Sequence, residues 1–116
     1  MEFINSHIRE RKHRRFRPAP TSNAKVIFSF MDLEVDSAVL DISLGGFAIH
    51  VKDLPVIIED QSELDFMFLV GNKHFTRNAK VVYSIMEPHL KNVIRYGLKF
   101  STTSTDEIEK IIQKYC

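Results

Sequence analysis

The sequence predicts a mainly β fold, a small six-stranded antiparallel β-barrel followed by a C-terminal amphipathic α-helix. Between residues 24 and 101 the chain contains six short stretches rich in β-branched and aromatic residues. The last twelve residues instead repeat their apolar positions with the period of a helix. At 116 residues, the chain is long enough for one domain with a modest core.

The predicted strands are short segments bounded by turn-forming residues, and they cover residues 24–30, 35–42, 46–51, 63–70, 74–86 and 93–101. In the third strand Phe47, Ile49 and Val51 share one face, whereas Ala48 and His50 share the other. Alternation of this kind predicts a strand with one face toward the core.

The fourth and fifth predicted strands form a hairpin. The fourth places four apolar side chains on one face, namely Leu64, Phe66, Phe68 and Val70. Gly71 and Asn72 follow directly, and both residue types tolerate the positive φ of a tight turn.

The C-terminal segment 104–115 predicts a helix. Its apolar side chains fall at helical spacing on one stripe, at Ile108, Ile111, Ile112 and Tyr115. Ser104 and Glu107 have the spacing of a capping box, which marks the helix start.

The N-terminal residues 1–23 form a predicted flexible arm ahead of the domain at residues 24–116. The run RERKHRRFRP, residues 9–18, holds six Lys or Arg residues and one Glu, a balance of +5 in a chain whose total is +1. The rest of the chain therefore carries −4. Pro18 and Pro20 exclude a continuous helix here. An arginine-rich arm on a mildly acidic body favours a phosphate-bearing partner.

The composition also predicts a cytoplasmic protein. Cys116 is the single cysteine, so an intrachain disulfide is impossible. The chain has no apolar run near the roughly 18 residues of a membrane span, and its first residues lack the pattern of a secretory signal.

A second motif, DISLGGF, covers residues 41–47 between two predicted strands. Asp41 and Ser43 would point to the same side of an extended chain. Gly45 and Gly46 permit a turn or a close approach. Taken alone, the same residues are also those of an ordinary turn.

The two motifs together resemble the PilZ domain family. Its hallmark is an RxxxR segment ahead of a small barrel that carries a (D/N)xSxxG segment. Here Arg11 and Arg15 form the first, and Asp41, Ser43 and Gly46 form the second. RYGLKF, residues 95–100, resembles the family's closing strand, so the resemblance spans residues 9–116, as expected of a stand-alone domain.

The resemblance implies a receptor for the bacterial second messenger cyclic di-GMP, with no metal and no other cofactor. The ligand contacts that it implies by motif are Arg11, Arg15, Asp41, Ser43 and Gly46. Neighbouring residues that could also contribute are Lys12, Arg14, Gly45 and His50. Because the arm is dense in arginine, Arg14 or Arg17 could take the role assigned to Arg15.

The chemistry of these residue types suits this ligand. An arginine fork pairs with phosphate or with guanine O6 and N7. A carboxylate beside a phosphate would repel it, so Asp41 is expected to accept the N1–H and N2–H₂ donors of a guanine edge instead. Ordering of the arm by the ligand would then signal to a downstream protein partner.

Two alternatives remain open. A small barrel with a basic arm also suits single-stranded nucleic acid, although the acidic body argues against this partner. A PilZ-fold adaptor that binds no nucleotide is the other. An enzyme is not expected, because the sequence has no P-loop, zinc-protease or nucleophile-elbow signature.

Overall fold

A computed structural model describes residues 14–102 and 106–116 of the chain. Six strands are followed by one α-helix, as predicted. The elements are η1 (Pro20–Ser22), β1 (Lys25–Phe30), β2 (Leu33–Ile42), β3 (Gly46–Lys52), β4 (Glu63–Val70), β5 (Lys73–Met86), β6 (Val93–Phe100) and α2 (Asp106–Tyr115).

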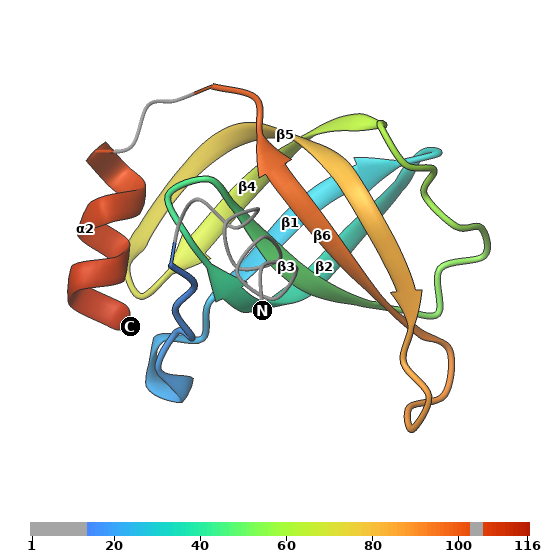
Figure 1. Cartoon of the computed structure of the whole chain (residues 1–116), viewed down its shortest axis with the longest axis horizontal. Coiled ribbons are helices and arrows are strands. Elements are labelled where there is room, and N and C mark those ends of the chain that lie inside the picture. Colours follow the sequence, from blue (N-terminus) through green and yellow to red (C-terminus); the bar gives the residue numbers. More distant parts are fainter. Residues whose placement is uncertain (1–13, 103–105) are drawn as a thin grey trace, which may run out of the picture.

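The six strands close into a barrel in which every pairing is antiparallel, in the order β1-β2-β3-β6-β5-β4 (Figure 1). Four of the six pairings join strands that are consecutive in the sequence. The remaining two, β3 with β6 and β1 with β4, close the cylinder. Because β6 lies between β3 and β5, residues far apart in the sequence lie on neighbouring strands.

The core fills the barrel with the side chains that the alternation predicted. Phe47 is fully buried and contacts the rings of Phe66, Phe68 and Phe100 at centroid distances of 5.2, 4.8 and 5.3 Å. Edge-to-face and tilted packing of aromatic rings stabilises the core by more than the burial of apolar area alone would. The predicted inward face of β3 is therefore confirmed.

The hairpin turns are only partly visible in the sequence. Gly71 adopts φ 60° between β4 and β5, as the turn prediction required. The β1–β2 turn uses Met31 and Asp32, both with positive φ. Met31 is not typical of such a turn and no glycine is present, so the turn signal in the sequence is weak here. The strand β2 begins at Leu33, two residues before the predicted start.

The helix α2 lies beside one end of the barrel (Figure 1). Ile108 and Ile111 are buried against the barrel, as the apolar stripe predicted, and Arg77 Nη2 lies 2.7 Å from Glu107 Oε1. Ser104, the predicted cap, lies outside the described residues. Within the described segments, no helix combines the length and apolar character needed to cross a membrane.

Residues 14–23, the described part of the arm, contact both the barrel and α2. Phe16 and Ile42 exchange two backbone hydrogen bonds of 2.8 Å. The Ala19 amide donates to the Tyr115 carbonyl at 2.6 Å. The Gly71 amide donates to the Ser22 carbonyl at 3.0 Å. The arm thereby places Arg15 beside the end of β2, while the mobility expected of the arm stays a prediction.

Candidate functional site

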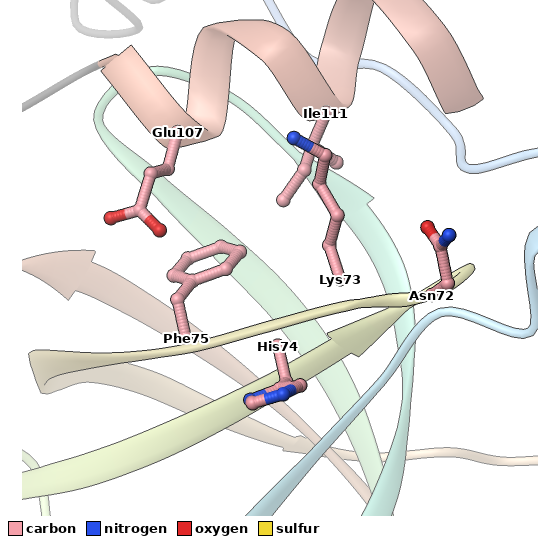
Figure 2. Close-up of a pocket in the computed structure, with 6 residues that line it drawn as sticks. All are labelled: Asn72, Lys73, His74, Phe75, Glu107 and Ile111. Carbon is pink, nitrogen blue, oxygen red and sulfur yellow. The ribbon is translucent and has the colours of Figure 1, made fainter.

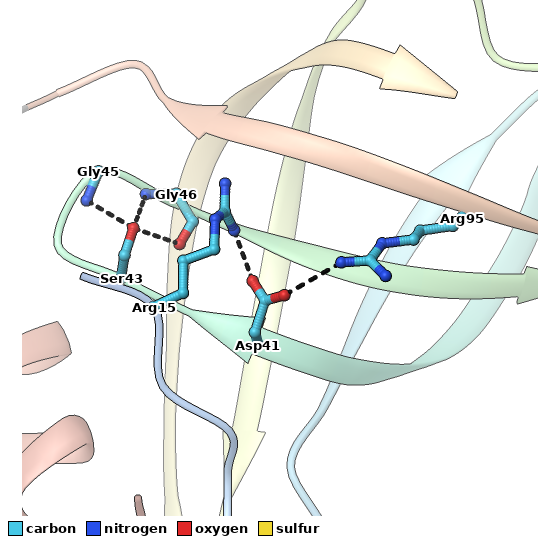
Figure 3. A network of polar contacts seen from close by, with 6 residues as sticks. All are labelled: Arg15, Asp41, Ser43, Gly45, Gly46 and Arg95. Atoms are coloured by element: carbon cyan, nitrogen blue, oxygen red, sulfur yellow. Dashed lines mark hydrogen bonds and ion pairs between the residues drawn. The ribbon is translucent and has the colours of Figure 1, made fainter. Parts of the chain in front are cut away.

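The DISLGGF segment forms the bend between β2 and β3. The extended chain ends at Ile42, so Ser43 lies in the bend and not in the strand that holds Asp41. Ser43 is 3% exposed, and its hydroxyl accepts the amides of Gly45 and Gly46 at 3.2 and 3.1 Å (Figure 3). The Ser43 side chain therefore holds the bend closed, a role typical of serine in turns.

Gly46 is buried at the start of β3, where β6 runs alongside. A Cβ at this position would overlap the Leu98 carbonyl oxygen and lie 3.2 Å from Lys99 Cα. These are backbone atoms, which cannot rotate away. Close pairing of two strands therefore requires a glycine at position 46.

A β-bulge turns Asp41 toward the outer face of the barrel. Strict alternation would place Asp41 on the same side as Val39, which faces the core. The β2–β3 register shifts between these two residues, and Asp41 pairs instead with the outward position of Ala48. A bulge of this kind re-aims one side chain without ending the strand.

On that outer face, Asp41 lies between two arginines. Arg15 Nη1 is 2.5 Å from Asp41 Oδ1, and Arg95 Nη2 is 3.3 Å from Asp41 Oδ2 (Figure 3). The Asp41 side chain is 13% exposed, against 24% for Arg15 and 37% for Arg95. The site thus joins residues that are 26 and 54 positions apart in the sequence.

Arg95 is the site residue that the sequence analysis missed. It lies on β6 opposite His50 of β3. Its side-chain hydrogen bond with Tyr83 raises the pKa of Arg95 above its ordinary value, and the nearby charges of Asp41 and Glu87 add smaller contributions in the same direction. The sequence shows an arginine in the predicted closing strand, but only the pairing register of the strands places that arginine beside Asp41.

The other predicted residues have separate positions. The exposed Arg14 lies over the Phe16 ring, 5.3 Å from its centroid, and Arg17 is exposed. His50 Nε2 lies 3.1 Å from Glu87 Oε2 on the same outer face. Arg11 and Lys12 lie outside the described residues.

The hollow between α2 and the β4–β5 turn is a different place (Figure 2). It has a volume of about 300 Å³ and contains no predicted site residue; its lining is Asn72, Lys73, His74, Phe75, Glu107 and Ile111. Figure 2 shows Phe75 and Ile111 pointing into the space between the helix and the strand. In the described segments, no group of three acidic, His or Cys side chains could hold a metal ion.

Comparison with protein families identifies the chain. The family model described as PilZ domain matches residues 9–116. The chain belongs to the PilZ domain family. This family consists of cyclic di-GMP receptors and is not a catalytic family. No curated protein sequence is detectably similar to this PilZ domain.

Solved structures confirm the PilZ fold. The PilZ domain of YcgR from Escherichia coli, solved with c-di-GMP, matches with a TM-score of 0.71 and 16% identity over 90% of each chain. The K. pneumonia MrkH–c-di-GMP complex matches with a TM-score of 0.70 and 18% identity over 90% of this chain and 49% of MrkH. The Bacillus subtilis inhibitor of motility, MotI/DgrA, matches at 0.69 and 16% over 89% of this chain and 48% of that protein. This PilZ domain thus spans about half the length of the latter two proteins.

Proposed function

We propose that this PilZ domain is a receptor that binds cyclic di-GMP between the arginine arm and the Asp41 bend. The observation that carries the proposal is the contact between Arg15 and Asp41, which joins the last residue of the RxxxR motif to the first residue of the DxSxxG motif. Family membership supports the nature of the ligand. The arrangement offers a guanidinium and a carboxylate to a molecule that has both phosphates and guanine donors.

Arg15 and Asp41 would recognise different parts of the ligand. Arg15, and Arg11 from outside the described residues, would pair with phosphate or with the guanine acceptor edge. Asp41 would accept the N1–H and N2–H₂ groups of guanine, because its oxygens lie at the outer face. Adenine has no N1–H and no N2 amino group, so Asp41 would distinguish the two purines.

Ser43 and Gly46 would act mainly through the shape of the bend. The hydrogen bonds of the Ser43 hydroxyl fix the turn that follows Asp41 directly. The close pairing at Gly46 fixes the start of β3 next to it. Preorganisation of this kind lowers the entropy cost of binding.

The arm offers a route by which binding could reach a partner. Arg15 precedes Phe16, which bonds to β2, and the Ala19 amide bonds to the last residue of α2. A ligand that draws Arg15 away from Asp41 would change the restraints on this segment. We infer that a cytoplasmic downstream protein recognises the changed arm or helix surface.

Isothermal titration calorimetry with cyclic di-GMP, cyclic di-AMP and GMP tests the proposal. We expect cyclic di-GMP to bind tightest, because it alone has two guanines and two phosphodiesters. Equal affinity for cyclic di-AMP would contradict the role of Asp41. No heat and no thermal shift with cyclic di-GMP would overturn the proposed function.

Single arginine substitutions test which part of the arm takes part. Arg11→Ala and Arg15→Ala should each weaken binding by about 1.5–3 kcal/mol, the usual value of a hydrogen bond to a charged group. Arg17→Ala is the matched control, since this exposed arginine lies in the same arm outside the motif. If Arg17→Ala costs as much as Arg15→Ala, the arm acts as general positive charge and the motif assignment is wrong.

A further inference from the structure

Asp41 already has a hydrogen-bond partner at each of its carboxylate oxygens. Oδ1 of Asp41 is bonded to Arg15, and Oδ2 is bonded to Arg95. A guanine edge that donates two parallel hydrogen bonds needs both oxygens. Each carboxylate oxygen has two lone pairs, so an arginine that lies clear of the guanine edge can keep its bond to Asp41 while the proposed ligand binds.

The two arginines differ in how the fold holds them. Arg15 precedes a single isolated bridge between Phe16 and Ile42. Arg95 lies within β6, which pairs with β3 on one side and with β5 on the other. The backbone at Arg15 could follow its side chain toward a phosphate at the cost of one isolated bridge, whereas the backbone at Arg95 is held by two neighbouring strands.

Two bulges build the surroundings of Arg95. The bulge in β2 brings Asp41 to the outer face on the β3 side of Arg95. A second register shift, in β5 between Val81 and Tyr83, brings Tyr83 to the same outer face, opposite Gly97. A Cβ at Gly97 would overlap the Tyr83 ring, so the glycine permits that ring to lie against β6. Both partners of Arg95 therefore depend on a departure from strict alternation.

We propose that Arg95 is a positioning residue that holds the Asp41 carboxylate in place after Arg15 has moved to the ligand phosphate. This inference rests on the proposed function and adds a specificity-determining residue outside both motifs. Arg95 keeps a positive charge beside Asp41, so the carboxylate can lie near an anionic ligand and still accept from guanine.

This role differs from direct binding of phosphate by Arg95. A phosphate contact is independent of the base, so its loss would weaken all cyclic dinucleotides equally. A positioning role acts through Asp41 and affects guanine recognition. The ratio of affinities for cyclic di-GMP and cyclic di-AMP separates the two roles.

Arg95→Gln and Arg95→Lys, in the full chain, test the inference. We expect Arg95→Gln to weaken cyclic di-GMP about tenfold and cyclic di-AMP less than threefold, which reduces the preference for guanine. Arg95→Lys keeps the charge but not the planar fork, so it should recover only part of that preference. Arg77→Gln is the matched control, because it removes another strand arginine paired with a carboxylate, here Glu107.

The outcomes are distinguishable by calorimetry and thermal unfolding of the same samples. Unchanged affinities in Arg95→Gln, with wild-type binding intact, overturn the positioning role and leave the proposed function standing. An equal loss for both dinucleotides, or a melting temperature that falls well below that of Arg77→Gln, assigns Arg95 to phosphate binding or to structure and also overturns it. Failure of the wild-type chain to bind cyclic di-GMP overturns both.

Discussion

Substitution of Asp41 by Asn compares two roles of this carboxylate, as the partner of Arg15 and Arg95 and as the proposed acceptor of guanine. In the free protein the change removes the negative charge of Asp41 and one of the two oxygens that accept from Arg15 and Arg95. Both arginines are partly exposed, so water replaces much of what they lose. We expect a loss of about 1 kcal/mol in the free energy of unfolding, near the upper end for exposed pairs. For a domain of this size that is a decrease of roughly 3–6 °C in melting temperature.

Binding of cyclic di-GMP changes through two opposed effects. Loss of the charged acceptor costs about 1.5–3 kcal/mol of guanine recognition. Release of Arg15 from Asp41 returns about 0.5–1 kcal/mol, because the arginine no longer has to leave a carboxylate before it reaches phosphate. The net effect is a loss of about 0.5–2.5 kcal/mol, which is roughly 2- to 70-fold in the dissociation constant. Cyclic di-AMP should bind equally well or slightly better, because it has no guanine contact to lose and gains from the release of Arg15.

Calorimetry with both nucleotides, beside thermal unfolding, checks this expectation. Asp36→Asn is the control, because Asp36 lies on the same strand and pairs with Lys25 at 3.0 Å on an exposed surface. It should change neither affinity and should alter stability by no more than about 0.5 kcal/mol. If Asp41→Asn lowers the melting temperature while cyclic di-GMP binds as before, Asp41 only fastens the arm and does not recognise guanine.

Three further predictions concern charge, titration and packing. The affinity of the wild-type protein for cyclic di-GMP should fall as salt rises, and Arg15→Ala should flatten that dependence in titrations at about 50 and 300 mM NaCl. An equal salt dependence in both proteins would show that Arg15 does not contact the phosphate. Burial raises the pKa of Tyr96, partly offset by the hydrogen bond from the Ile58 amide. The neutral phenol is thus favoured in the folded state, so the free energy of unfolding should decline as pH rises above the ordinary value of 10. Urea titrations at pH 8 and 10.5 should show a smaller decline in Tyr96→Phe, which also loses about 1 kcal/mol at pH 8 with that bond; an equal decline would show that Tyr96 is not the group responsible. Gly46→Ala should cost about 2 kcal/mol or more in urea unfolding, because its Cβ meets backbone at Leu98, and a loss under 0.5 kcal/mol would contradict that packing.

The number of strands and their inward faces could be predicted, because burial imposes a local alternation on the sequence. Alternation along β3 and β4 identified the core residues, for example Phe47 and Phe66. The apolar stripe identified the buried side of α2 at Ile108. The glycine at position 71 marked a turn because a positive φ favours glycine.

The composition of the candidate site could be predicted only in part, because bulges and register leave no such trace. The motifs pointed to Arg15 and Asp41, which the structure brings into contact. Strict alternation would have turned Asp41 inward, and the bulge that turns it outward has no signature in the sequence. Arg95 enters the site through the β3–β6 pairing, a contact between strands that are not neighbours in the chain.

The closure of the barrel is uneven, and this has a consequence for how the domain opens. Only three residue pairs join β1 to β4, from Lys25 to Ile27, whereas eight pairs join β4 to β5. This short seam continues into the arm, where the Ser22 carbonyl accepts from Gly71. The barrel should therefore open locally first between β1 and β4, and any change that loosens the arm lowers the free energy of that local opening.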